Sequence, residues 1–143
     1  MNSSAAKTWD QLKVDARVEC PFSFEQSDLD AFAKLSGDFN PLHLDQAYAR
    51  ERGFEGTVVY GALIVAAVSR LLGMELPGPG CLWQSLSLHF TGPLYAGQKA
   101  RVAGQIVYAN PELSVLRLSL EVKSQDRLIA RGQAQAQVLK SRP

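Results

Sequence analysis

The segment from Gly61 to Leu72 constrains the fold most, because it is almost entirely apolar. Its apolar residues are Ala62, Leu63, Ile64, Val65, Ala66, Ala67, Val68, Leu71 and Leu72. A helix that is apolar on nearly all sides has to be covered by other structure. The run contains Ser69 and Arg70 and is well short of the roughly 20 residues that span a bilayer, so we expect no membrane partner. Gly61 opens the predicted helix and Gly73 is its natural end, although extension to Glu75 would cost little.

Downstream of this helix the apolar pattern changes to a period of two residues, which is typical of strands. In 82–90 one predicted face carries Gln84, Leu86, Leu88 and Phe90, and the other carries Ser85, Ser87 and His89. Further alternating or strand-like segments follow at 102–108, 116–123 and 127–139, separated by turn residues. Consecutive strands joined by tight turns form an antiparallel sheet.

Upstream of the apolar helix, one strand and two short helices are expected. Apolar residues alternate within 11–24, from Val14 to Cys20, and indicate the first strand. Helical spacing over 27–35 and 45–52 predicts the two helices, with Gly53 as a left-handed cap. Residues 1–10 are expected to be a flexible tail, and 11–143 a single domain.

One architecture buries both the apolar helix and an apolar face of every strand in a single core. It is a curved antiparallel sheet wrapped around the central helix, with the two short helices as an overhang. This is the hot-dog fold, of the α+β class. A doubly wound parallel sheet is disfavoured, because no helix of crossover length separates the later strands.

Composition excludes several functional classes. Fifteen basic and fourteen acidic residues give a formal charge of +1, so nothing indicates a nucleic-acid partner. Cys20 and Cys81 are isolated, and with only two histidines they make a poor set of metal ligands. We expect no metal, no cofactor and two buried, reduced thiols. The first residues lack the apolar core of a signal peptide, which makes the cytoplasm the expected compartment.

The segment from Ser36 to His43, with sequence SGDFNPLH, contains the candidate site. Pro41 lacks a backbone N–H and disfavours a helical conformation at Asn40, so a loop is expected. In a continuous helix, five residues would turn His43 roughly 140° away from Asp38. A loop can bring the two side chains together.

Each polar residue of this segment has a structural and a functional interpretation. Asp38 could cap the loop and Asn40 could form an Asx turn. His43 could be a satisfied structural histidine, or a base, since an unperturbed histidine has a pKa near 6.5. Carboxylate and imidazole together suit proton transfer.

The run from Leu35 to Leu44 resembles the signature of the MaoC-like, (R)-specific enoyl-CoA hydratases. The glycine that opens the apolar helix, Ser69 within it, and the Leu-Pro-Gly turn before 84–88 are also similar, so the resemblance covers roughly 14–139. It implies a hot-dog homodimer, an acyl-CoA or acyl-carrier thioester as substrate, and reversible hydration of a trans-2-enoyl thioester to an (R)-3-hydroxyacyl thioester. The open edges of the sheet also favour a homodimer.

The resemblance implies roles for six residues. Asp38 and His43 would be the acid and base, in an order that the sequence leaves open, and the N–H of Gly61 would stabilise the thioester oxyanion. The substrate would be bound or positioned by Asn40, Tyr60 and Ser69.

Alternative roles stay open for three of these residues. The Gly61 position could also serve close packing, and the Ser69 hydroxyl could bond back to its own helix. Family members commonly have a histidine where this chain has Tyr60. Either Tyr60 substitutes for it in packing or orienting the loop, or the difference indicates an altered pocket with another substrate range or rate. The sequence permits two other functions: a noncatalytic acyl-thioester-binding or assembly subunit, and a thioesterase. The thioesterase ranks low, because the helix carries no carboxylate before Glu75.

Overall fold

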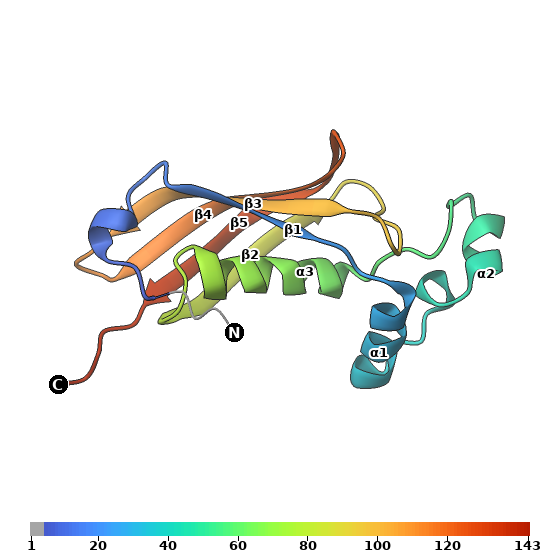
Figure 1. The fold of residues 1–143 in the computed structure, drawn as a ribbon, viewed down its shortest axis with the longest axis horizontal. Helices are drawn as coiled ribbons and strands as arrows, with labels where there is room; N and C mark the ends of the chain where they lie inside the picture. The colour runs from blue at the N-terminus through green and yellow to red at the C-terminus, as the bar shows by residue number, and fades with distance from the viewer. Residues whose placement is uncertain (1–4) are drawn as a thin grey trace.

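The computed structural model describes residues 5–143 and contains one five-stranded antiparallel sheet with a helix lying across one face (Figure 1). The spatial order of the strands is β1-β3-β4-β5-β2. The strands are Arg17–Phe22 (β1), Cys81–Phe90 (β2), Ala100–Asn110 (β3), Val115–Ser124 (β4) and Arg127–Val138 (β5). The predicted antiparallel sheet is confirmed. No helix among the described residues is long and apolar enough to cross a bilayer.

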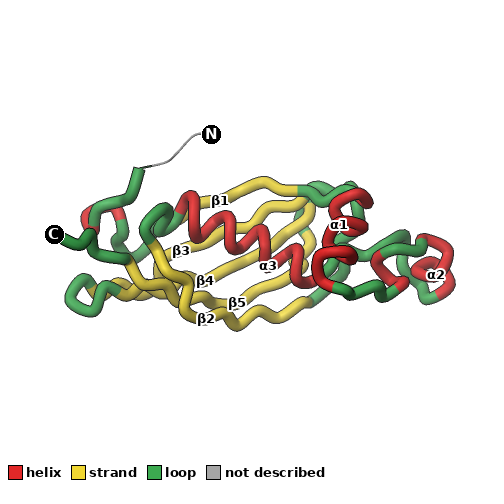
Figure 2. The backbone as a smooth tube through the Cα atoms, turned by 90° about the horizontal axis from the view of Figure 1, so that it is seen from below, coloured by secondary structure: helices red, strands yellow, loops and turns green. Residues whose placement is uncertain are grey.

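Helix α3, Gly61–Arg70, is the predicted apolar helix, and Figure 2 shows it running across the sheet. It continues without interruption into a π-helical turn, η3, Leu71–Glu75, so Gly73 does not end it. Leu71 and Leu72 at the start of this turn are 0% and 1% exposed. Their burial against the sheet keeps the chain helical through the glycine.

The expectation that α3 is covered on most sides is wrong for the single chain. Ile64, Ala67 and Val68 face the sheet and are buried. Ala62 and Ala66, on the opposite side, are exposed. One sheet can cover only one side of a helix, so an apolar stripe remains open to solvent.

Two strand predictions need correction. Strand β1 begins at Arg17 rather than near Val14, because Asp15 has a positive φ of 76° and breaks the extended conformation. Strand β2 has a register shift between Trp83 and Ser85. As a result Trp83 packs against the core, whereas Gln84 accepts a hydrogen bond of 2.9 Å from the side chain of Gln135 and does not share a face with Leu86.

The remaining elements form the expected overhang beyond one end of the sheet (Figure 1). They are helix α1, Gln26–Ser36, the 3-10 turn η2, Pro41–His43, and helix α2, Gln46–Glu51. Near the N-terminus, a 3-10 turn, η1, spans Trp9–Gln11, and Trp9 packs against the core. Of the expected tail, residues 1–4 lie outside the described part of the chain.

Two glycines, one in β3 and one in β5, allow close packing in the core. A Cβ on Gly104 would lie 2.8 Å from Leu71 Cδ2. Because glycine has no Cβ, the end of α3 can pack closely against the sheet. Gly132 pairs with Leu88 across β5 and β2, and a Cβ there would lie 1.8 Å from the carbonyl oxygen of Ser87. Backbone atoms cannot move aside as a flexible side chain can, so only glycine fits at 132.

Replacing Gly132→Ala is therefore expected to lower the free energy of unfolding by about 2 kcal/mol through overpacking. The matched control is Gly73→Ala, because nothing lies within 4 Å of the added methyl group. That change should range from neutral to about 1 kcal/mol stabilising in a helical position. Urea unfolding followed by circular dichroism measures both, and equal effects would contradict the packing described here.

Candidate active site

The candidate site begins where α1 ends. Gly37 adopts the left-handed conformation, with φ of 78°, and its N–H donates to Ala33 O at 2.8 Å. The Ser36 hydroxyl donates to Phe32 O and accepts the N–H of Asp38 at 3.1 Å. The chain therefore leaves the helix sharply, and the loop predicted from Pro41 is confirmed.

Asp38 and Asn40 shape the loop through their own side chains. Asp38 Oδ1 accepts the N–H of Asn40, and Asn40 Oδ1 accepts the N–H of Leu42, each at 3.1 Å. Asn40 is thereby the cap of η2, and its structural interpretation is confirmed. Both side chains are exposed, and one oxygen of the Asp38 carboxylate makes no hydrogen bond to the described residues. This oxygen is free to contact a ligand.

His43 is half-buried and held in one tautomer. Its Nδ1 lies 2.6 Å from the carbonyl oxygen of Val58. A carbonyl can only accept, so Nδ1 carries the proton, and in the neutral ring Nε2 is left with a lone pair. The N–H of Val58 donates to Leu42 O at 3.1 Å, which fixes this carbonyl beside the loop. The arrangement presents a base at Nε2.

Tyr60 connects both ends of the loop to the start of α3. It is only 2% exposed, and its hydroxyl donates to the backbone carbonyl of Asp38 at 2.5 Å. Its ring stacks on the imidazole of His43, with 3.9 Å between centroids and 25° between planes. Burial raises the pKa of Tyr60, and the carboxylates of Asp38 and Asp30 raise it further. The phenol is therefore a neutral donor at physiological pH.

The first turn of α3 follows directly. The carbonyl of Tyr60 accepts the N–H groups of Leu63 and Ile64, whereas the N–H groups of Gly61 and Ala62 have no acceptor among the described residues. Free N–H groups at a helix start attract negative charge. A Cβ on Gly61 would lie 3.1 Å from the ring of Phe90, so a side chain at this position would displace that ring slightly. Both interpretations of Gly61 remain compatible.

Ser69 is the predicted site residue that the single chain does not bring to the loop. It lies eight residues after Gly61, about 12 Å along the helix axis, and is exposed. Its hydroxyl makes no hydrogen bond among the described residues, so the backbone bond considered from the sequence is not formed. A positioning role for Ser69 stays a prediction.

Sequence reasoning missed a polar bridge beneath the loop. The side chain of Gln26, in α1, donates to the backbone carbonyl of His43 at 3.0 Å and accepts from the Thr57 hydroxyl at 2.6 Å. Thr57 is 7% exposed, so the bridge is shielded from water. Gln26 and Thr57 are 31 residues apart in the sequence, and no local pattern links them.

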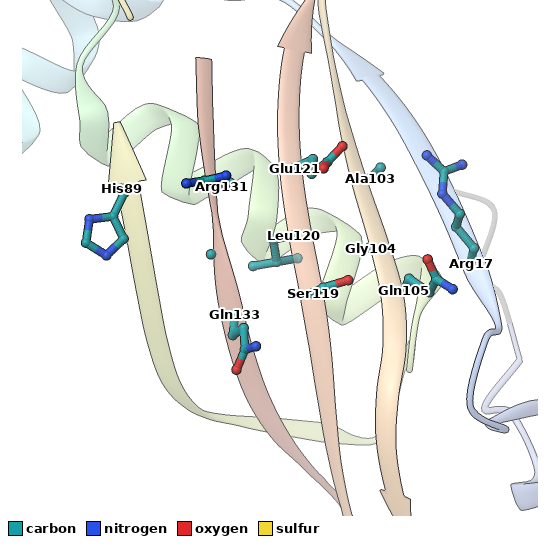
Figure 3. A pocket seen from close by; sticks show the side chains of 11 residues that line it. Arg17, His89, Ala103, Gly104, Gln105, Ser119, Leu120, Glu121, Arg131 and Gln133 are labelled. Carbon is teal, nitrogen blue, oxygen red and sulfur yellow. The ribbon is translucent and has the colours of Figure 1, made fainter. Parts of the chain in front are cut away.

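The second histidine lies away from this site. His89 lines a polar groove on the face of the sheet opposite α3, together with Arg131, Glu121 and Gln133 (Figure 3). Charges beside the groove are paired at the surface, as between Arg17 and Glu19 at 2.7 Å. The structural interpretation of His89 agrees with this position.

The cysteines and possible metal ligands offer no second centre. Within residues 5–143, no cluster of three or more His, Cys, Asp or Glu residues could hold a metal. Both thiols are free, but only Cys20 is fully buried, and Cys81 is partly exposed. Burial raises the pKa of each thiol, which keeps it protonated and unreactive.

A family model described as MaoC like domain matches residues 6–113, well over half of the chain. The chain belongs to the MaoC-like family. An (R)-specific enoyl-CoA hydratase of Aeromonas caviae is 33% identical over 119 residues, covering 83% of this chain and 89% of that protein. A 3-hydroxybutyryl-CoA dehydratase of Methylorubrum extorquens is 32% identical, covering 92% and 84%.

Solved structures of MaoC-like proteins agree with the fold. The (R)-hydratase of Aeromonas caviae matches with a TM-score of 0.85 and 32% identity, over 89% of this chain and 97% of that one. An R-hydratase of Pseudomonas aeruginosa matches with a TM-score of 0.86 and 30% identity, over 93% and 86%. The hot-dog architecture predicted from the sequence is confirmed.

The tautomer of His43 can be checked directly, because the chain has only two histidines. Long-range ¹H–¹⁵N spectra at alkaline pH are expected to show His43 protonated at Nδ1, as the 2.6 Å contact with Val58 requires. His89→Gln removes the other signal and assigns the spectrum. A His43 ring protonated at Nε2 would contradict the site geometry.

Proposed function

We propose that this MaoC-like chain catalyses the reversible hydration of trans-2-enoyl-CoA thioesters to (R)-3-hydroxyacyl-CoA thioesters. The proposal is supported by the contacts of Tyr60, which touches Asp38 and His43 and directly precedes Gly61. A free oxygen of Asp38 and the lone pair of His43 Nε2 lie on a loop that Tyr60 fastens to the start of α3, where Gly61 offers a free N–H. The names of the relatives, an (R)-specific enoyl-CoA hydratase and a 3-hydroxybutyryl-CoA dehydratase, support the same reaction.

The reaction follows from these groups. His43 Nε2 removes a proton from a water molecule that the Asp38 carboxylate orients, and the water oxygen bonds to C3 of the enoyl group. Electron density moves onto the thioester oxygen, which the N–H of Gly61 stabilises at the positive end of α3. The imidazolium then returns its proton to C2. One water is added across the double bond, and His43 ends as it began.

Turnover assays on crotonyl-CoA and longer enoyl-CoAs, followed by loss of enoyl absorbance, test the proposal. Asp38→Asn and His43→Ala are each expected to lower kcat by about 10²- to 10⁴-fold, the usual contribution of acid–base groups. Chiral analysis of the product should show the (R) configuration, and His89→Gln serves as the matched control.

Three results would contradict the proposal. Full activity of both variants would remove Asp38 and His43 from the reaction. Binding of acyl-CoA without turnover at any chain length would instead favour a noncatalytic acyl-thioester-binding subunit. Release of free thiol would identify a thioesterase, although α3 carries no carboxylate.

The same chain is proposed to act as a homodimer. The outer edge of β2 pairs with no other strand among the described residues, and the Ala62–Ala66 stripe of α3 is uncovered. Phe90, at the end of β2, is 51% exposed beside Gly61. A second copy pairing along β2 would satisfy the edge and cover apolar surface next to the proposed site.

Light scattering at micromolar concentration is expected to give the mass of a dimer. Ala66→Glu places a charge on the uncovered stripe and should shift the protein toward monomer. Gln133→Glu adds the same charge on the opposite face of the sheet and should not. A wild-type monomer, or equal behaviour of the two variants, would contradict this interface.

A further inference from the structure

The side chain of Tyr60 contacts both residues proposed to move protons. We propose that Tyr60 is a positioning residue, which fixes Asp38 and His43 in a single mutual geometry through its hydroxyl and its ring. This role rests on the proposed function of the two residues. Tyr60 stands at the position where MaoC-like proteins usually have a histidine, and positioning would be the function of the tyrosine there.

The hydroxyl of Tyr60 links Asp38 to the rest of the protein through a hydrogen bond to the Asp38 backbone carbonyl. The other hydrogen bonds of Asp38 are local, to Ser36 and Asn40, and these give the loop its shape without fastening it elsewhere. Among the described residues, only the Tyr60 hydroxyl reaches Asp38 from outside the loop, 22 residues along the chain. Because the phenol is buried, water competes poorly for this hydrogen bond.

The ring of Tyr60 completes the restraint on His43. Val58 holds the imidazole at Nδ1, and Gln26 holds the backbone carbonyl. Neither contact covers the face of the ring, which Tyr60 stacks upon at 3.9 Å. Phe32 also packs against Tyr60, with 4.7 Å between ring centroids and 57° between ring planes. The direction of Nε2 is thereby fixed, and small displacements of such a group can cost about a hundredfold in rate.

A tyrosine performs this task differently from a histidine. The titratable groups around it are Asp30 of α1 and Asp38 and His43 of the loop, and the two carboxylates favour the neutral phenol. The phenol cannot become a cation beside His43. The hydroxyl therefore stays a donor to the Asp38 carbonyl at all pH values near neutrality. The ring that stacks on the His43 imidazole does not become charged.

A graded set of variants separates the two contacts. Tyr60→Phe keeps the ring and loses the hydroxyl, and it is expected to lower kcat about tenfold while KM changes less than about twofold. Tyr60→Leu loses both contacts and should lower kcat about a hundredfold. Tyr60→His restores a ring with an N–H donor and should recover activity above that of Tyr60→Leu. Tyr108→Phe, which removes a phenol that accepts from Asn110 in β3, is the matched control and should leave both constants unchanged.

Nuclear magnetic resonance tests the geometry without relying on turnover. In the wild type, stacking on Tyr60 should shift the ring protons of His43 upfield. The shift should persist in Tyr60→Phe and disappear in Tyr60→Leu. Circular dichroism confirms folding, and if Tyr60→Leu does not fold, Tyr60→Phe and Tyr60→His still decide the role of the hydroxyl.

The outcomes distinguish this role from the proposed function. If His43→Ala abolishes hydration but kcat is unchanged in Tyr60→Phe and Tyr60→Leu, the positioning role is overturned and the hydratase assignment stands. A rise in KM alone, with kcat unchanged, also overturns the positioning role. If no enoyl thioester is turned over, the hydratase assignment fails, and the ring-proton shifts alone decide whether Tyr60 holds His43.

Discussion

The packing of α3 against the inner face of the sheet is the constraint on which the rest of the structure depends. Gly104 and Gly132 remove the side chains that would hold the helix and neighbouring strands apart. This contact fixes the axis of α3 and leaves its first turn at the end of the sheet where the overhang lies (Figure 1). The N–H of Gly61 consequently lies at the end of α3 that is next to the loop. The contact also leaves one side of α3 open, so burial in the single chain is incomplete.

The fold was largely predictable from periodicity, and the misses have identifiable causes. The change from a continuous apolar run to a period of two residues determined the order of helix and strands. A one-residue register shift at Trp83–Ser85 is set by pairing with β5, and the local pattern of polar and apolar residues does not contain it. The helix continues past Gly73 because Leu71 and Leu72 are buried against the sheet.

The loop and the helix start could be predicted from the sequence, but the contacts that connect them could not. Pro41 and the Asp38–His43 spacing identified the loop, and the position of Gly61 identified the helix start. The loop and the helix start are held in place by contacts between distant segments, such as the hydrogen bond between Gln26 and Thr57. Contacts of this kind cannot be recognised in a single sequence. Tyr60 was visible as a departure from the family pattern, but only its hydrogen bond and ring stacking show that it binds both halves of the loop.

If the loop and the start of α3 form one site, a bound substrate has to contact both. The most direct measurement is a crystal structure of the Asp38→Asn variant with a trans-2-enoyl-CoA. We expect the thioester oxygen at the N–H of Gly61 and C3 of the enoyl group facing His43 Nε2, with Tyr60 still hydrogen-bonded to the backbone carbonyl of residue 38. A thioester bound elsewhere, or bound with its oxygen away from Gly61, would show that the loop and the helix start do not form one site.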